Sequence, residues 1–302
     1  MFSSFLQGLR PLSRILVFVL LCFFIGGLCS LLGVKLLKSL YGLSLPQDYA
    51  LLQNFDEAWV LSANKFLLLV QHLGFFVLPG LLFVVFAYGK TALKAPKIQH
   101  KKMFLAFVLG LALYPLIGFL AYLNEQIPLG ESLLQMEESA ARFTMAVVRS
   151  EDIGTFIYNL FLIAVIPAVG EELVFRGILQ REMEVQLQKP LLAIVFASVL
   201  FSTMHMQFAG FIPRFFLGMV LGWVYYQTRN IWVPIALHFA NNALALTLVF
   251  ILQPEVDSIS EFDSFQWDLS TILFTLGSIV VSYFIIKSQF GFQKAEALQM
   301  SA

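Results

Sequence analysis

Residues 155–177 read "TFIYNLFLIAVIPAVGEELVFRG", an apolar run that ends in two adjacent glutamates. A helix needs about 20 apolar residues to cross the hydrocarbon core of a bilayer, and this stretch is long enough. Glu171 and Glu172 stand side by side near its end, and Arg176 follows four residues after Glu172. An ionisable side chain at membrane depth costs about 2.5–3.5 kcal/mol on insertion scales, so these three residues are candidates for a function.

The composition of the whole chain indicates a membrane protein. Of its 302 residues, 59% are hydrophobic and only 13% are charged. Soluble domains carry about 25% charged residues, so this chain lacks the polar surface that water requires. We therefore expect an integral membrane protein that is embedded in the lipid bilayer. The net charge of zero argues against a nucleic-acid partner.

Eight apolar stretches predict an all-α fold with about eight transmembrane helices. The expected spans are Ile15–Val34, Phe66–Tyr88, Met103–Leu123, Thr155–Phe175, Leu191–Gln207, Ile212–Tyr226, Ile231–Leu252 and Leu269–Ile286. Two further segments, residues 128–149 and 177–190, place apolar residues at helical spacing between charges. That pattern is typical of amphipathic helices at the membrane interface, although a plain connector is the alternative for each.

The basic residues predict the orientation of the spans. Residues 89–102, "GKTALKAPKIQHKK", carry five lysines and no acid, so this end is expected to face the cytoplasm. Residues 253–268, "QPEVDSISEFDSFQWD", carry five acids and no base, and are expected outside. Eight alternating spans then place both termini in the cytoplasm.

The two glutamates differ in their local partners. Glu172 and Arg176 are four residues apart on a helix, so they share a face and can form an ion pair. Glu171 lies about 100° around the same helix, so Arg176 serves it less well. We therefore expect Glu171 to have a partner on another helix or a chemical role.

Histidines within the other apolar stretches are the candidate partners. His205 follows Phe201 by one helical turn, and His238 precedes Asn242 by one turn. Each histidine alone is more often a satisfied interior residue than a functional one. Two histidines and two glutamates on three helices predict a common interior site. His72 has no acid nearby in the sequence and is expected to be structural.

These residues together resemble the motifs of the CAAX protease and bacteriocin-processing (CPBP, or Abi) family of intramembrane peptidases, which includes the Ras-converting CAAX endopeptidases. The family motifs E-E-x-x-x-R, F-x-x-x-H and H-x-x-x-N are matched by Glu171, Glu172 and Arg176, by Phe201 and His205, and by His238 and Asn242. The resemblance covers residues 155–250, the expected catalytic core. Residues 1–154 would supply the N-terminal helices and the outer amphipathic segment, and residues 251–302 the outer acidic loop and the last span.

The resemblance implies hydrolysis of a peptide bond in a membrane-associated or lipidated, CAAX-like peptide or protein. Glu171 would activate water as the general base, with His205 holding that water or a metal ion. His238 and Asn242 would stabilise the oxyanion, and Glu172 and Arg176 would support the site. Glu171, His205 and His238 are also a plausible set of ligands for one zinc ion with a position open for water. Since no H-E-x-x-H motif is present, we favour the metal-free mechanism.

Two other functions fit the buried polar residues. A proton- or cation-coupled transporter also carries acids and histidines at membrane depth. Here, however, they cluster in one half of a chain without an internal repeat. A catalytically silent immunity or partner-binding protein of the same fold is the third possibility, and the intact motifs argue against it.

The expected span boundaries contain one geometric conflict. Glu171 would lie at the inner end of its span, whereas His205 would lie about 22 Å along a span that starts inside.

Gly218 and Gly222 form a small-x-x-x-small pair, which predicts close packing of their helix against a neighbour.

Overall fold

The long apolar runs of the sequence form long helices in the computed structural model, which describes residues 2–43, 49–55, 57–89, 97–253 and 268–291. These residues form helices and no strand, so the all-α prediction is confirmed for them. The helices, with the short 3₁₀ and π segments labelled η, are α1 (Phe2–Gly8), α2 (Pro11–Tyr41), η1 (Tyr49–Gln53), α3 (Ala58–His72), η2 (Leu73–Val77), α4 (Leu78–Phe83), η3 (Val84–Tyr88), α5 (His100–Ala112), α6 (Tyr114–Glu125), α7 (Glu131–Val148), α8 (Ile153–Asn159), η5 (Leu160–Val165), α9 (Ile166–Val174), η6 (Phe175–Gln180), α10 (Arg181–Leu187), α11 (Pro190–Thr203), α12 (Phe211–Thr228), α13 (Trp232–Leu252) and α14 (Leu269–Gln289).

Several helices are long and apolar enough to cross a membrane. In the described part of the chain there are five, namely Pro11–Tyr41, Ala58–Tyr88, Ile153–Leu187, Trp232–Leu252 and Leu269–Gln289. The α5–α6 pair, bent by 40° ahead of Pro115, adds a sixth if it is one span. All eight expected spans coincide with helices, but the count of about eight is not confirmed. At 14 residues, α11 is about 21 Å long, which is shorter than the hydrocarbon core.

The fourth span does not end where expected, and residues 177–187 continue it instead of forming a separate helix. The chain continues from Ile153 to Leu187 as one helical stretch of 35 residues. Of the polar residues after Arg176, Gln180 and Glu182 are buried between helices, at 0% and 2% exposure, whereas Arg181, Gln186 and Gln188 are exposed. The hydroxyl of Tyr88 donates to Glu182 at 2.6 Å. These partners let polar side chains sit inside the bundle, where the sequence pattern indicated an aqueous interface.

The other expected amphipathic segment does form a separate helix, α7. It exposes Leu133, Leu134 and Met136 and buries its last turn. Asp152 begins the next helix, α8, by accepting hydrogen bonds from the backbone N–H groups of Gly154 and Thr155. A further hydrogen bond from the Thr155 hydroxyl lowers the pKa of Asp152 below its usual value.

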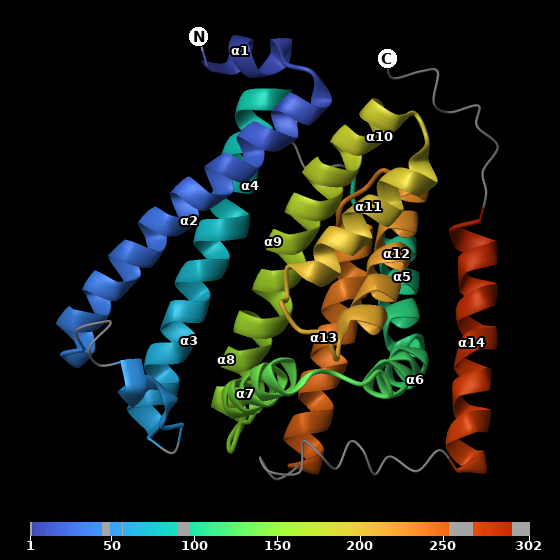
Figure 1. Cartoon of the computed structure of the whole chain (residues 1–302). Coiled ribbons are helices and arrows are strands. Elements are labelled where there is room, and N and C mark those ends of the chain that lie inside the picture. Colours follow the sequence, from blue (N-terminus) through green and yellow to red (C-terminus); the bar gives the residue numbers. More distant parts are fainter. Residues whose placement is uncertain (1, 44–48, 56, 90–96, 254–267, 292–302) are drawn as a thin grey trace.

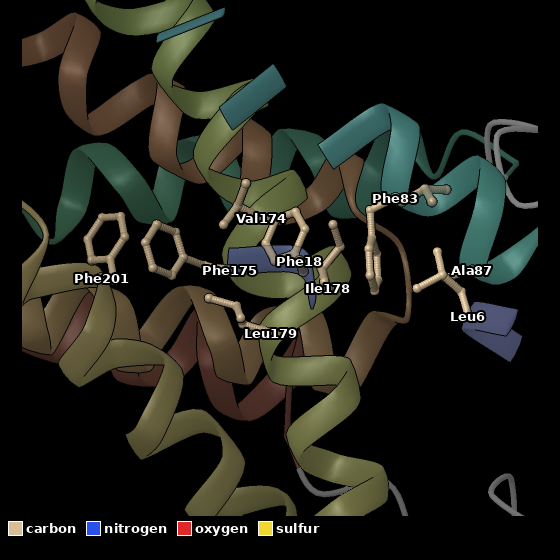
Figure 2. Close-up of a cluster of buried hydrophobic side chains, with 10 residues drawn as sticks. Leu6, Phe18, Phe83, Ala87, Val174, Phe175, Ile178, Leu179 and Phe201 are labelled. Atoms are coloured by element: carbon tan, nitrogen blue, oxygen red, sulfur yellow. The ribbon is translucent and has the colours of Figure 1, made fainter. Parts of the chain in front are cut away.

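The long helix α8–α10 lies at the centre of the bundle (Figure 1). On one flank it packs against α2, α3 and α4, and on the other against α11 and α13. A cluster of buried apolar side chains joins the two flanks (Figure 2). It includes Phe18 of α2, Phe83 of α4, Phe175 of η6 and Phe201 of α11. A second cluster ties α5, α12 and α13 together.

The segments used to predict orientation are only partly described. Lys90 and Lys94 of the basic segment, and residues 254–267 of the acidic segment, lie outside the described residues. Which side of the membrane each terminus faces stays a prediction, as does the division of the chain at residues 154 and 250.

Candidate functional site

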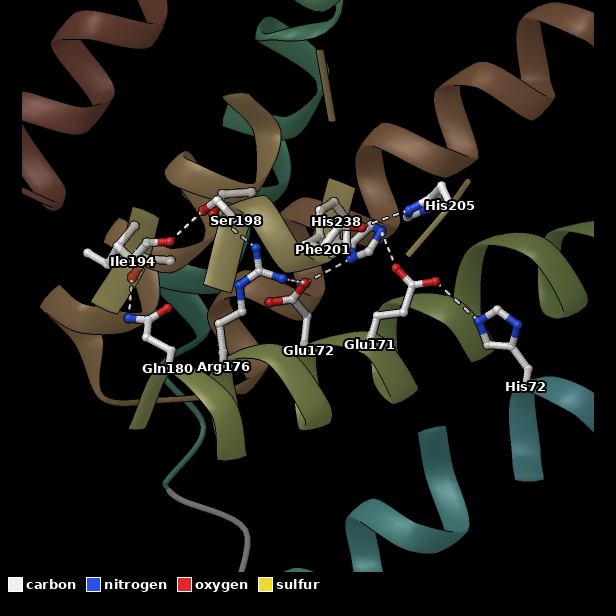
Figure 3. Close-up of polar contacts among 12 residues, drawn as sticks. His72, Glu171, Glu172, Arg176, Gln180, Ile194, Ser198, Phe201, His205 and His238 are labelled. Carbon is white, nitrogen blue, oxygen red and sulfur yellow. Dashed lines mark hydrogen bonds and ion pairs between the residues drawn. The ribbon is translucent and has the colours of Figure 1, made fainter. Parts of the chain in front are cut away.

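Glu171 and Glu172 lie near the middle of the long central helix, and both are buried, at 6% and 0% exposure (Figure 3). Arg176, one turn further on, is also fully buried, and its guanidinium donates to Glu172 Oε1 at 2.8 Å. The expected ion pair is therefore confirmed. Both partners of this ion pair are buried, so removing one of them would leave the other charge unpaired in an apolar interior.

A ladder of hydrogen bonds fixes this helix against α12. Arg176 donates to the carbonyl of Gly218 at 2.9 Å, and Gln180, one turn later, donates to the carbonyl of Gly222 at 3.0 Å. A Cβ at Gly218 would lie 3.0 Å from the Cβ of Ser198, tighter than ordinary contact. The close packing expected for these two glycines is confirmed, and the glycines leave their carbonyls open to the side chains of the facing helix.

His238 of α13 stands between the two glutamates. Its Nδ1 is 2.9 Å from Glu172 Oε1, and its Nε2 is 3.9 Å from Glu171 Oε2. An ionised carboxylate only accepts hydrogen bonds, so Nδ1 carries the proton shared with Glu172. The second distance is too long for a hydrogen bond, so Nε2 faces Glu171 without being bonded to it. His238 therefore links the first and third motifs.

His205 lies directly after the end of α11, at the level of the glutamates. The Phe201 ring is 5.3 Å from the His205 ring and 5.7 Å from the His238 ring, centroid to centroid. His205 Nδ1 donates to the carbonyl of Phe201 at 2.9 Å, which leaves Nε2 available as an acceptor. The described contacts include no direct hydrogen bond between His205 and Glu171, although the two interact electrostatically.

The expected spans placed Glu171 and His205 at different depths in the membrane. The observed end of the central helix at Leu187 removes this conflict. Because the central helix runs on to Leu187, Glu171 is at mid-helix rather than at an end. The chain then turns back into α11, and Phe201 packs edge-on against Phe175 at 5.2 Å. The antiparallel return thus brings His205 level with Glu171.

Asn242 lies one turn beyond His238 and contacts the backbone of the central helix. Its Nδ2 donates to the carbonyl of Ile163 at 3.4 Å. Pro167, four residues after Ile163, has no N–H with which to complete the helical bond to that carbonyl. A neighbouring helix supplies the missing donor, as is usual where proline interrupts a membrane helix. In the described contacts Asn242 does not reach either glutamate.

His72 of α3 is the site residue that the sequence did not reveal. Its Nε2 is 3.2 Å from Glu171 Oε1, and its ring stacks on Phe76. The expectation of a purely structural histidine does not account for this contact. The sequence does contain one indication of this contact, which is the glycine at position 170, directly before Glu171. A Cβ there would lie 3.1 Å from the Cβ of Phe76, so glycine permits the approach of the segment after His72.

The predicted zinc ligands are not arranged as a metal site. Within the described ranges, no group of three or more His, Cys, Asp or Glu side chains could hold a metal ion. The predicted ligands Glu171, His205 and His238 do not converge on one position, although each histidine keeps Nε2 free of other partners in the described residues. We therefore assign no step to a metal.

The three motifs lie within one segment of the chain that a protein-family model matches. Residues 153–244 match the family described as type II CAAX prenyl endopeptidase Rce1-like. The resemblance drawn from the motifs is confirmed over this Rce1-like segment, which begins at the first residue of α8 and includes Glu171, His205, His238 and Asn242. His72 lies outside it. No match was found among curated proteins or among solved structures.

The Rce1-like match and the apolar helices agree on a class of protein. The family is one of proteases, and several helices of this chain are long and apolar enough to span a bilayer. The match covers 92 of the 302 residues and shows likeness to this protease family for that segment, and the apolar helices indicate a chain that can cross a bilayer several times.

Proposed function

We propose that this protein is an intramembrane endopeptidase that uses water activated by Glu171 to hydrolyse a peptide bond of a membrane-associated or lipidated, CAAX-like substrate. One observation carries the proposal. Glu171 is a buried carboxylate within the Rce1-like segment, it is not ion-paired to Arg176, and its Oε2 faces His238 without a hydrogen bond. A buried carboxylate with one free oxygen beside two histidines has the features of a general base.

Glu172 is the less suitable base because its Oε1 pairs with the buried Arg176, and a proton on Glu172 would leave that guanidinium without its counter-ion. That single oxygen accepts both from Arg176 and from His238. The role that fits Glu172 is to orient His238 and to balance the charge of Arg176. Glu171 is then the carboxylate left for proton transfer.

The reaction proceeds by addition of water to the scissile carbonyl. Water held between Glu171 and His205 gives a proton to Glu171 Oε2 while its oxygen bonds to the carbonyl carbon. The carbonyl oxygen becomes an oxyanion, which His238, held at Nδ1 by Glu172, stabilises together with Asn242. As the C–N bond breaks, the proton on Glu171 passes to the leaving nitrogen. The enzyme is regenerated with an ionised Glu171.

The decisive experiment compares wild type with Glu171→Gln in the same membranes by peptide profiling, with and without a chelator. Cleavage is expected to disappear in Glu171→Gln. Glu184→Gln is the matched control, since Glu184 is on the same helix, pairs with Arg229, and as glutamine still offers an oxygen to Gln180. If processing persists with Gln at position 171 while the control behaves as wild type, Glu171 is not the base.

A further inference from the structure

We infer that His72 is a positioning residue of this site, and that its hydrogen bond to Glu171 Oε1 directs the other oxygen, Oε2, toward the reacting water. The inference rests on the proposed function and extends it to a helix outside the Rce1-like segment. His72 does not touch the reacting atoms in this scheme. It acts through Glu171 alone.

The two oxygens of Glu171 face two different histidines. Oε1 is 3.2 Å from His72 Nε2, and Oε2 is 3.9 Å from His238 Nε2 (Figure 3). Only the first distance is that of a hydrogen bond by the usual criteria. A carboxylate held at one oxygen cannot rotate freely about its last torsion, so the identity of its free oxygen is fixed. General-base catalysis depends on such control, because a misplacement of about 1 Å costs on the order of 10²-fold in rate.

The ring of His72 is itself held in place. It stacks on Phe76 with ring centroids 4.9 Å apart and planes inclined by 21°. Phe76 in turn packs against Phe175 of the central helix at 6.4 Å. The π-helical segment η2 begins directly after His72 and precedes Pro79, whose missing N–H favours a wider turn there. The local backbone and the aromatic stack therefore aim His72 at Glu171.

A purely packing role for His72 predicts different behaviour from a positioning role. If the ring only fills space against Phe76, phenylalanine at position 72 would preserve the stack and the activity. If the N–H matters, phenylalanine would fail and glutamine, which offers a donor N–H at a similar reach, would restore part of the rate. The two substitutions thus separate shape from hydrogen bonding.

The test uses the full chain in lipid nanodiscs and a farnesylated, internally quenched peptide with a CAAX-like end. For His72→Phe we expect kcat to fall about 10²-fold with KM unchanged, the order expected for a misplaced catalytic group. His72→Gln is expected to recover at least a tenth of the wild-type kcat. His100→Phe is the control, because His100 is exposed at the start of α5, and it is expected to match wild type.

A second measurement examines the contact without relying on activity. Thermal unfolding of wild type, His72→Phe, Glu171→Leu and the double variant forms a double-mutant cycle, because leucine at position 171 has no acceptor for His72. We expect the double variant to lose less stability than the two single losses combined, since both remove the same hydrogen bond. Additive losses, or full kcat in His72→Phe, would overturn the role of His72 while leaving the proposed function intact. A wild-type protein that does not cleave the peptide would count against the proposed function itself.

Discussion

Glu172 Oε1 accepts two hydrogen bonds from residues that are far apart in the sequence, one from Arg176 at 2.8 Å and one from His238 at 2.9 Å. The second contact joins residues 66 positions apart. A single oxygen therefore ties the central helix to α13. This arrangement separates the two adjacent glutamates, because Glu172 is the counter-ion of Arg176, whereas Glu171 has no arginine partner and presents Oε2 to His238 Nε2.

The buried Glu172–Arg176 pair is expected to behave as a unit. Glu172→Gln leaves the Arg176 charge buried without its counter-ion, so we expect a loss of about 3–5 kcal/mol in the free energy of unfolding. The double variant Glu172→Gln, Arg176→Met removes the charge and keeps an oxygen for His238, so it should be more stable than Glu172→Gln alone. Thermal unfolding in nanodiscs measures both. Equal losses in the two proteins would contradict this account.

The glycine contact between α11 and α12 predicts a position-specific effect of alanine. Gly218→Ala places a Cβ 3.0 Å from the Cβ of Ser198, so α11 or α12 must shift by a few tenths of an ångström at the turn whose carbonyl accepts from Arg176. We expect lower stability and lower activity. Gly27→Ala in α2 is the control, since nothing lies within 4 Å of a Cβ there. Its stability should stay equal or rise slightly, because alanine favours helix. A neutral Gly218→Ala would rule out tight packing at this contact.

Asn242 and Pro167 are expected to be coupled through the carbonyl of Ile163. Asn242→Leu removes this donor to the part-buried carbonyl of Ile163, which costs up to about 1–3 kcal/mol. In a Pro167→Ala background, the restored N–H of residue 167 can serve that carbonyl, so the same substitution should cost less. Thermal unfolding of wild type, Asn242→Leu, Pro167→Ala and the double variant measures the coupling free energy between the two positions. The proposed role of Asn242 at the oxyanion predicts that activity stays low in Asn242→Leu in both backgrounds.

Chelation is expected to leave peptidase activity unchanged. Within the described residues, Glu171, His205 and His238 do not form a group that could hold a metal ion. We predict equal cleavage rates before and after treatment of the purified protein with 1,10-phenanthroline. A reversible loss of activity that zinc restores would show that the metal-free assignment is wrong.

Much of the fold was predictable from local sequence. Apolar runs of the right length predict helices, and the helix over residues 155–175 was expected correctly apart from its end. The error at that end has a physical cause. Polar residues such as Gln180 and Glu182 indicate an aqueous interface when they are considered alone, but here other helices supply their hydrogen-bond partners. A sequence window contains no information about those distant partners.

The sequence by itself determined the helical class, the membrane setting, the pairing of Glu172 with Arg176 and the three motifs of the Rce1-like segment, because each depends on residues within a few helical turns or on residue type. Only the tertiary structure decided that His72 meets Glu171 across 99 positions, that His238 bonds to Glu172, and that His205 lies level with both glutamates. These contacts depend on where α3, α11 and α13 cross the central helix. Close approach at glycines and the return of the chain after Leu187 set those crossings, and no local pattern encodes them.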